Sequence, residues 1–134
     1  GVKTNWVRNS AVVDYLKEIN TKNTLLIADA CFGGSIFQTR SAFSNEEKAI
    51  EVLYDLPSRK AMTSGTLTEV PDRSAFTRFL VMRLNENKEK YLPSQALFIR
   101  LRNAVINNSS AIPLFGEIKS VGDQGGDFIF IRRE

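Results

Sequence analysis

The chain of 134 residues contains no histidine and only one cysteine. A single cysteine forms no disulfide within the chain, which is typical of a protein in a reducing compartment such as the cytoplasm. A transition-metal site needs several His or Cys ligands, so this composition predicts neither a metal nor another bound cofactor. Catalysis by a histidine base would need that residue from outside the chain.

Long apolar runs and concentrated charge are also absent. The longest apolar segments, 24–28 and 128–131, are too short to cross a bilayer, and no signal peptide is visible. The net charge is only +3, and the basic residues are scattered along the chain. Nucleic-acid binding normally needs a concentrated basic face. We therefore expect neither a membrane nor a nucleic acid as a direct partner.

The remaining composition is that of an ordinary α/β protein, with 43% hydrophobic and 25% charged residues. The length suits one domain with a real core. Periodicity and turn residues predict helices over 10–19, 46–54, 74–84 and from 93 onward, and strands over 25–28, 60–63, 114–118 and 128–131. This order predicts a layered α/β domain with a central, mostly parallel sheet.

The apolar positions predict which faces of these elements are buried. The short apolar run at 25–28 predicts a fully buried strand in the centre of the sheet, and the four predicted strands would form one sheet. The expected inward faces of the helices are Val12, Leu16 and Ile19; Phe76, Phe79, Leu80 and Leu84; and Leu97, Leu101, Ala104 and Val105.

Cys31 stands in an unusual local context. A free cysteine is most often a small buried apolar residue. Here it follows an apolar strand. Gly33 and Gly34 come two and three residues later, so the backbone can turn sharply and a substrate carbonyl can approach closely. Asp29 would project to the same side as Cys31 if the strand geometry continued. Because ligands bind at the carboxyl edge of open α/β sheets, these residues predict a reactive thiol.

The segment 25–34, Leu-Leu-Ile-Ala-Asp-Ala-Cys-Phe-Gly-Gly, resembles the nucleophile strand and turn of the caspase-like cysteine peptidases, including metacaspases and clostripain-like enzymes. Segment 61–65 resembles the following strand and substrate-binding loop, and segment 74–80 resembles the next helix, with its Ser-x-Phe-Thr start. Segment 128–130 fits the closing strand. The similarity implies a caspase-like layered fold, of which residues 1–134 form the carboxyl-terminal portion of a single peptidase domain.

The missing histidine is consistent with this resemblance. Caspase signatures place the histidine about 50 residues before the cysteine. Only thirty residues precede Cys31, so the histidine would lie before Gly1. The resemblance thus implies a partner, the upstream half of the same domain, which carries the histidine and the first strands. That half belongs either to the same polypeptide or to a second chain made by maturation cleavage; a pseudoenzyme lacking the histidine altogether is the third interpretation.

The resemblance also implies roles for the residues of the turn. Cys31 would attack the scissile carbonyl of a peptide substrate to give an acyl-enzyme, with its backbone N–H as one donor of the oxyanion hole. Gly33 and Gly34 would form the turn. Caspases carry glutamine where this chain has Asp29, and a carboxylate there implies a preference for Arg or Lys at P1. The structural alternative is that Asp29 only accepts hydrogen bonds from turn amides.

Three further residues are candidates for the same site. Ser64 would line the S1 pocket because its strand should lie beside the cysteine strand, although serine before glycine is also common in turns. Glu69 would add negative charge to the pocket or would simply be solvated. Arg40 is a candidate self-cleavage site, as in a zymogen that processes itself, if the enzyme cuts after basic residues.

The predicted function is therefore a cysteine endopeptidase, and its main alternative is a non-catalytic regulatory or assembly module. A phosphate-binding turn at Gly33 and Gly34 is a weak interpretation, because no clear helix and no P-loop lysine follow them. The sequence has no calcium-binding loop either.

Overall fold

The computed structural model describes residues 9–32, 36–38, 49–66 and 74–133. Its elements, in chain order, are α1 (Asn9–Glu18), β1 (Asn23–Ala28), α2 (Ile50–Asp55), β2 (Ser58–Thr63), α3 (Ala75–Glu86), β3 (Tyr91–Pro93), α4 (Ser94–Asn108), β4 (Leu114–Glu117) and β5 (Ile129–Ile131). The predicted mixture of helices and strands is confirmed. Only β3 was not expected, because three residues that end in proline do not carry a strand pattern.

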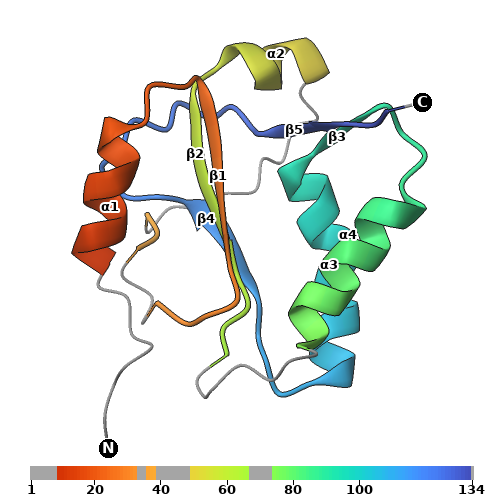
Figure 1. Cartoon of the computed structure of the whole chain (residues 1–134). Coiled ribbons are helices and arrows are strands. Elements are labelled where there is room, and N and C mark those ends of the chain that lie inside the picture. The colour runs from red at the N-terminus through yellow and green to blue at the C-terminus, as the bar shows by residue number, and fades with distance from the viewer. Residues whose placement is uncertain (1–8, 33–35, 39–48, 67–73, 134) are drawn as a thin grey trace, which may run out of the picture.

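The strands form two separate sheets (Figure 1). A three-stranded sheet has the order β1-β2-β4, in which β1 and β2 are parallel and β4 is antiparallel to β2. β3 and β5 pair with each other in a second, antiparallel sheet. The prediction of one four-stranded sheet is therefore wrong.

The predicted central place of β1 is also wrong within the described residues, where β1 pairs with β2 alone and lies at the edge of its sheet. Its residues are mostly half-buried, and Ile27 is exposed. The apolar run indicated burial correctly in part, but hydrophobicity alone does not say which strands are neighbours.

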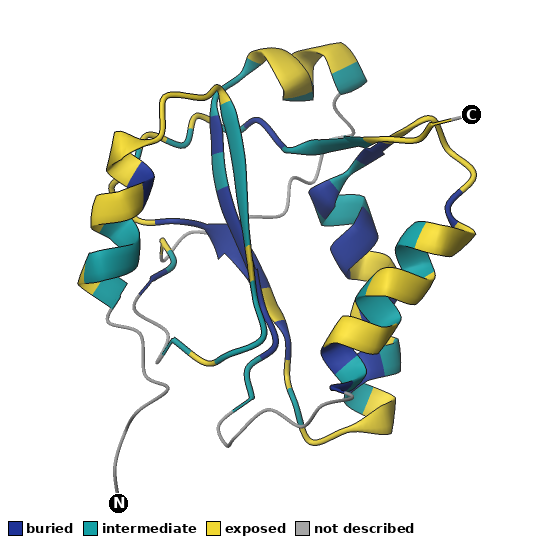
Figure 2. Ribbon diagram, in the orientation of Figure 1, coloured by how far each residue is buried: buried dark blue, intermediate teal, exposed yellow. Residues whose placement is uncertain are grey.

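The three-stranded sheet lies between helices on both faces (Figure 1). Successive residues of β2 point to opposite faces, as in any strand. Met62 belongs to one core cluster, which includes residues of α3 and α4, and Ala61 belongs to another, which includes Leu16 of α1. Figure 2 shows that β2, β4 and one side of α4 are deeply buried, whereas α3 is buried at Phe76 and half-buried along the rest of its inner side.

The larger core cluster contains most of the predicted inward faces. Its buried residues are Met62, Phe76, Leu92, Leu97, Phe98, Leu101, Val105 and Phe115, against which Phe79, Leu80 and Leu84 pack. Phe98 was not predicted; its ring lies 5.5 Å from that of Phe115. Ile19 was predicted inward but is 40% exposed, because α1 ends one residue earlier.

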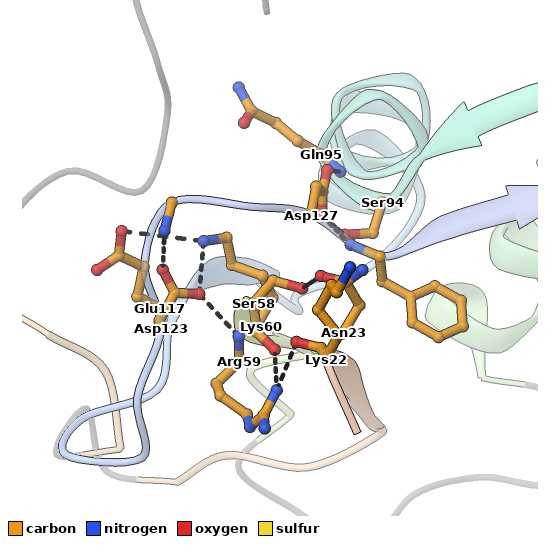
Figure 3. A network of polar contacts seen from close by, with 12 residues as sticks. Lys22, Asn23, Ser58, Arg59, Lys60, Ser94, Gln95, Glu117, Asp123 and Asp127 are labelled. Atoms are coloured by element: carbon orange, nitrogen blue, oxygen red, sulfur yellow. Dashed lines mark hydrogen bonds and ion pairs between the residues drawn. The ribbon is translucent and has the colours of Figure 1, made fainter. Parts of the chain in front are cut away.

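A buried ionic network occupies the amino end of β2 (Figure 3). The Lys60 ammonium lies 2.7 Å from Asp123 Oδ2 and 3.8 Å from Glu117 Oε1, and the side chains of all three residues are buried. Asp123 Oδ2 also accepts a hydrogen bond of 2.8 Å from the Arg59 backbone N–H. The segment after β4 is thus tied to β2 by charges that water does not screen.

Replacing Asp123 with Asn should lower the free energy of unfolding by about 3 kcal/mol, because the buried Lys60 ammonium loses its nearest counter-charge. Asp55→Asn is the matched control, since the exposed Lys22–Asp55 pair at 3.9 Å contributes about 0–1 kcal/mol. Urea denaturation of both variants measures the difference. Equal stabilities would contradict a structural role for the network.

Asp127 joins the start of α4 to the approach to β5. Its Oδ1 accepts hydrogen bonds from the Ser94 hydroxyl and the Phe128 N–H, and its Oδ2 accepts one of 3.0 Å from the Gln95 N–H. Burial raises the pKa of the Asp127 carboxyl above its ordinary value of 3.8, although these hydrogen bonds and the Lys60 charge act in the opposite direction. Desolvation is thus the stronger effect at this position.

A raised folded-state pKa means that the folded protein binds the proton of Asp127 more tightly than the unfolded chain does. Its contribution to stability is therefore complete below pH 3.8 and declines as the pH rises through the folded-state pKa. The stability of wild type minus that of Asp127→Asn should accordingly fall with rising pH in urea denaturation series. A difference that grows with pH would show that the hydrogen bonds outweigh burial.

Candidate active site at the carboxyl ends of β1 and β2

The parallel pairing of β1 and β2 brings two predicted site segments together. Pairing continues beyond the strands, since Ser64 N–H donates to Ala28 C=O at 3.0 Å and Gly65 N–H donates to Ala30 C=O at 3.1 Å. Ser64 therefore follows a strand that lies beside the cysteine strand, as expected. In Figure 1 this end of the sheet is opposite α2, near the first turn of α3.

Cys31 is exposed, and its thiol is free. β1 ends at Ala28, so the alternation of a strand does not extend to residues 29–31 and does not by itself set the direction of Cys31 relative to Asp29. The next residue is anchored: Phe32 packs against the α1 side of the core, and its carbonyl accepts a hydrogen bond of 2.8 Å from Asn9 Nδ2. The thiol is thus accessible, and hydrogen bonds hold the residues on either side of Cys31, namely Ala30 and Phe32.

Asp29 makes a side-chain contact with the first turn of α3. Thr77 Oγ1 donates a hydrogen bond of 3.0 Å to Asp29 Oδ2 at an exposed position. Asp29 Oδ1, in contrast, is buried and has no hydrogen-bond partner among the described residues. The hydrogen bonds from turn amides that the structural alternative required are not found within this part of the chain. A desolvated carboxylate oxygen without a hydrogen bond is unfavourable for the folded state.

Ser64 is buried rather than open to solvent. Its hydroxyl lies 2.9 Å from Thr66 Oγ1 and accepts a hydrogen bond of 3.2 Å from the Thr66 N–H. The side chain therefore shapes the turn after β2, and its predicted part in an S1 pocket stays a prediction.

Four of the predicted site residues, Gly33, Gly34, Arg40 and Glu69, lie outside the described residues. Their predicted roles in the turn, in self-cleavage and in the S1 pocket are therefore expectations from the sequence alone.

Two residues of this region were not predicted as part of it. These residues are Asn9, which lies before the predicted helix 10–19, and Thr77, which was noted only as part of the Ser-x-Phe-Thr start of a helix. Ser74 is the N-cap of α3, and its side chain accepts a hydrogen bond of 3.2 Å from the Thr77 N–H. This cap fixes the first turn of α3, and the Thr77 side chain with it, next to Asp29. The Ser-x-x-Thr spacing was the available signal.

Other kinds of site find little support in the described part of the chain. No group of three or more His, Cys, Asp or Glu residues there is arranged to hold a metal ion, and no helix there is long and apolar enough to cross a membrane. A shallow pocket of about 250 Å³ lies at the amino end of β1, away from Cys31, and is lined by Thr21, Lys22, Asn23, Tyr54, Phe128 and Ile129.

Comparison with protein-family models, with curated proteins and with solved structures finds no match to this chain.

Gly65 adopts a left-handed conformation beside Ser64, with φ of 72°. A Cβ at this position would lie 2.2 Å from the Ile112 carbonyl oxygen, which is part of the backbone. Gly65→Ala should therefore lower the free energy of unfolding by about 1–2 kcal/mol because of the left-handed conformation. The backbone shift that the Cβ forces near Ile112 should lower it by about 1–3 kcal/mol more. Gly122→Ala is the matched control, because its φ is 97° but its Cβ would meet no atom within 4 Å.

Denaturant unfolding of the two glycine variants separates these contributions. Gly122→Ala should show only the conformational cost, and a similar loss of stability in both variants would contradict the close approach of Ile112 to the turn after β2.

Proposed function

We propose that this chain is the nucleophile-bearing portion of a caspase-like cysteine endopeptidase that cleaves after Arg or Lys. The observation that carries the proposal is the position of two residues at the carboxyl end of β1: Cys31 with an exposed thiol and, two residues earlier, Asp29, whose Oδ2 is held by Thr77 at an exposed position. A nucleophile and an anionic recognition group are what peptide cleavage after a basic residue requires.

In the proposed mechanism, the Cys31 thiol gives its proton to the histidine of the upstream half, and its sulfur attacks the scissile carbonyl carbon to form a tetrahedral intermediate. Its oxyanion accepts a hydrogen bond from the Cys31 backbone N–H, which typically contributes about 3–4 kcal/mol at the transition state. Collapse breaks the C–N bond, and the leaving amine takes a proton from the histidine of the upstream half. Water then hydrolyses the thioester. Gly33 and Gly34 would give the turn the freedom that this approach needs.

Substrate preference would come from Asp29, with contributions from Ser64 and Glu69. The positive P1 side chain would compensate the Asp29 carboxylate, and an acidic P1 side chain would meet a like charge. Arg40, nine residues after the cysteine in the sequence, would then be a cleavage site for the enzyme itself. A maturation cut at that position fits an enzyme made as a zymogen.

The upstream partner is supported by the free edge of the sheet. β1 pairs with β2 alone among the described residues, although a parallel sheet is usually covered on both sides and extended at its edges. We propose that strands of the upstream half add to β1 and bring the histidine near Cys31. An exposed free thiol further fits a reducing compartment such as the cytoplasm.

The absence of histidine also favours a second candidate function, a non-catalytic module with a caspase-like fold. The sequence that precedes Gly1 separates the two: a histidine followed by glycine in that segment favours catalysis, and its absence favours the module.

The decisive experiment uses the complete polypeptide and matched peptides that differ only in Arg, Lys or Asp at P1. The basic peptides should be cleaved with kcat/KM at least about 100-fold higher than the Asp peptide, the range expected from one or two hydrogen bonds to a charged group. Cys31→Ala should abolish turnover. Asp29→Asn should lower kcat/KM for the Arg peptide by about 10- to 100-fold.

The control for Asp29→Asn is Glu51→Gln, the same chemical change at an exposed position of α2. It should leave the kinetics unchanged. A preference for the Asp peptide would overturn the assignment of Asp29, and a complete protein that contains the histidine yet cleaves none of the peptides would favour the non-catalytic module.

A further inference from the structure

The hydrogen bond between Thr77 and Asp29 joins two parts of the chain that are 48 residues apart. Thr77 is held on its own side, because its N–H donates to the Ser74 side chain and α3 packs on the core through Phe76. Asp29 directly follows β1, next to the turn after β2. The hydroxyl of Thr77 therefore comes from a rigid element and fixes one rotamer of a carboxylate.

The two oxygens of this carboxylate are not equivalent. Oδ1 is buried, whereas Oδ2 makes its hydrogen bond with Thr77 at an exposed position. A carboxylate oxygen accepts two hydrogen bonds, so Oδ2 keeps capacity for a second donor. In this conformation a ligand reaches Asp29 at Oδ2 alone.

We propose that Thr77 is a positioning residue that presents Asp29 to a cationic P1 side chain through one oxygen only. The inference rests on the proposed function and deepens it, since it states how the site chooses between two basic side chains. A guanidinium gains its advantage over an ammonium from pairing with both oxygens of a carboxylate at once. A single accessible oxygen removes that advantage, so the site accepts Lys about as well as Arg.

The test compares kcat/KM of the complete enzyme for matched peptides with Arg or Lys at P1. Wild type should cleave the two within about tenfold of each other. Thr77→Val removes the hydroxyl at similar shape and frees the carboxylate to turn. In this variant, kcat/KM should fall more for the Lys peptide than for the Arg peptide. The Arg/Lys ratio of kcat/KM should therefore rise about tenfold, the lower end of what one hydrogen bond to a charged group contributes.

Two variants control for general damage. Thr77→Ser keeps the hydroxyl and should keep the wild-type ratio. Thr24→Val removes another exposed threonine hydroxyl, which lies 2.8 Å from Thr21 Oγ1 at the other end of β1, and should leave the ratio unchanged. A merely structural role of Thr77 would lower the turnover of both peptides without moving their ratio.

The outcomes separate this inference from the proposed function. Cleavage after basic residues with the same Arg/Lys ratio in wild type and Thr77→Val would overturn the role of Thr77 and leave the proposed function intact. So would a wild-type preference for Arg of more than about 100-fold. Preference for the Asp peptide, or no cleavage by the complete protein, would overturn both.

Discussion

The parallel pairing of β1 with β2 is the constraint on which the other features depend. It joins Asn23 to Ser58 at one end and Ala28 to Thr63 at the other, and backbone hydrogen bonds extend it to Ala30 and Gly65. Parallel strands run in the same direction, so their carboxyl ends meet at one edge. The cysteine turn and the turn after β2 are neighbours for this reason, although more than thirty residues separate them along the chain.

The two ends of this strand pair carry different charged groups, and each end has one buried side-chain atom without a hydrogen-bond partner among the described residues. At the amino end that atom is Arg59 Nε. The buried Lys60 ammonium there has two carboxylates within 4 Å, and Asp123 accepts further hydrogen bonds. At the carboxyl end, Asp29 keeps a buried oxygen without a partner among the described residues, and Cys31 is exposed. A satisfied ionic network stabilises a fold, whereas a buried polar atom without a hydrogen-bond partner costs free energy.

In the proposed enzyme, the catalytic residues would be divided between this chain and an upstream half. The chain supplies the thiol and the carboxylate, but contains no histidine, and β1 has an edge without a neighbour in the described part of the chain. Strands of the upstream half that pair with β1 would cover that edge and would bring the histidine toward the thiol. The same contact would thus complete both the sheet and the active site.

Local patterns in the sequence determined the elements and the candidate nucleophile. The periodicity of 74–84 predicted α3, and the apolar run before Asp29 predicted β1, because hydrophobic spacing acts over a few residues. Tertiary structure decided which strands are neighbours: it placed β1 at an edge and paired β5 with the unexpected β3. It also brought Thr77 to Asp29. Contacts over such distances depend on how whole elements pack, and no short-range pattern encodes that.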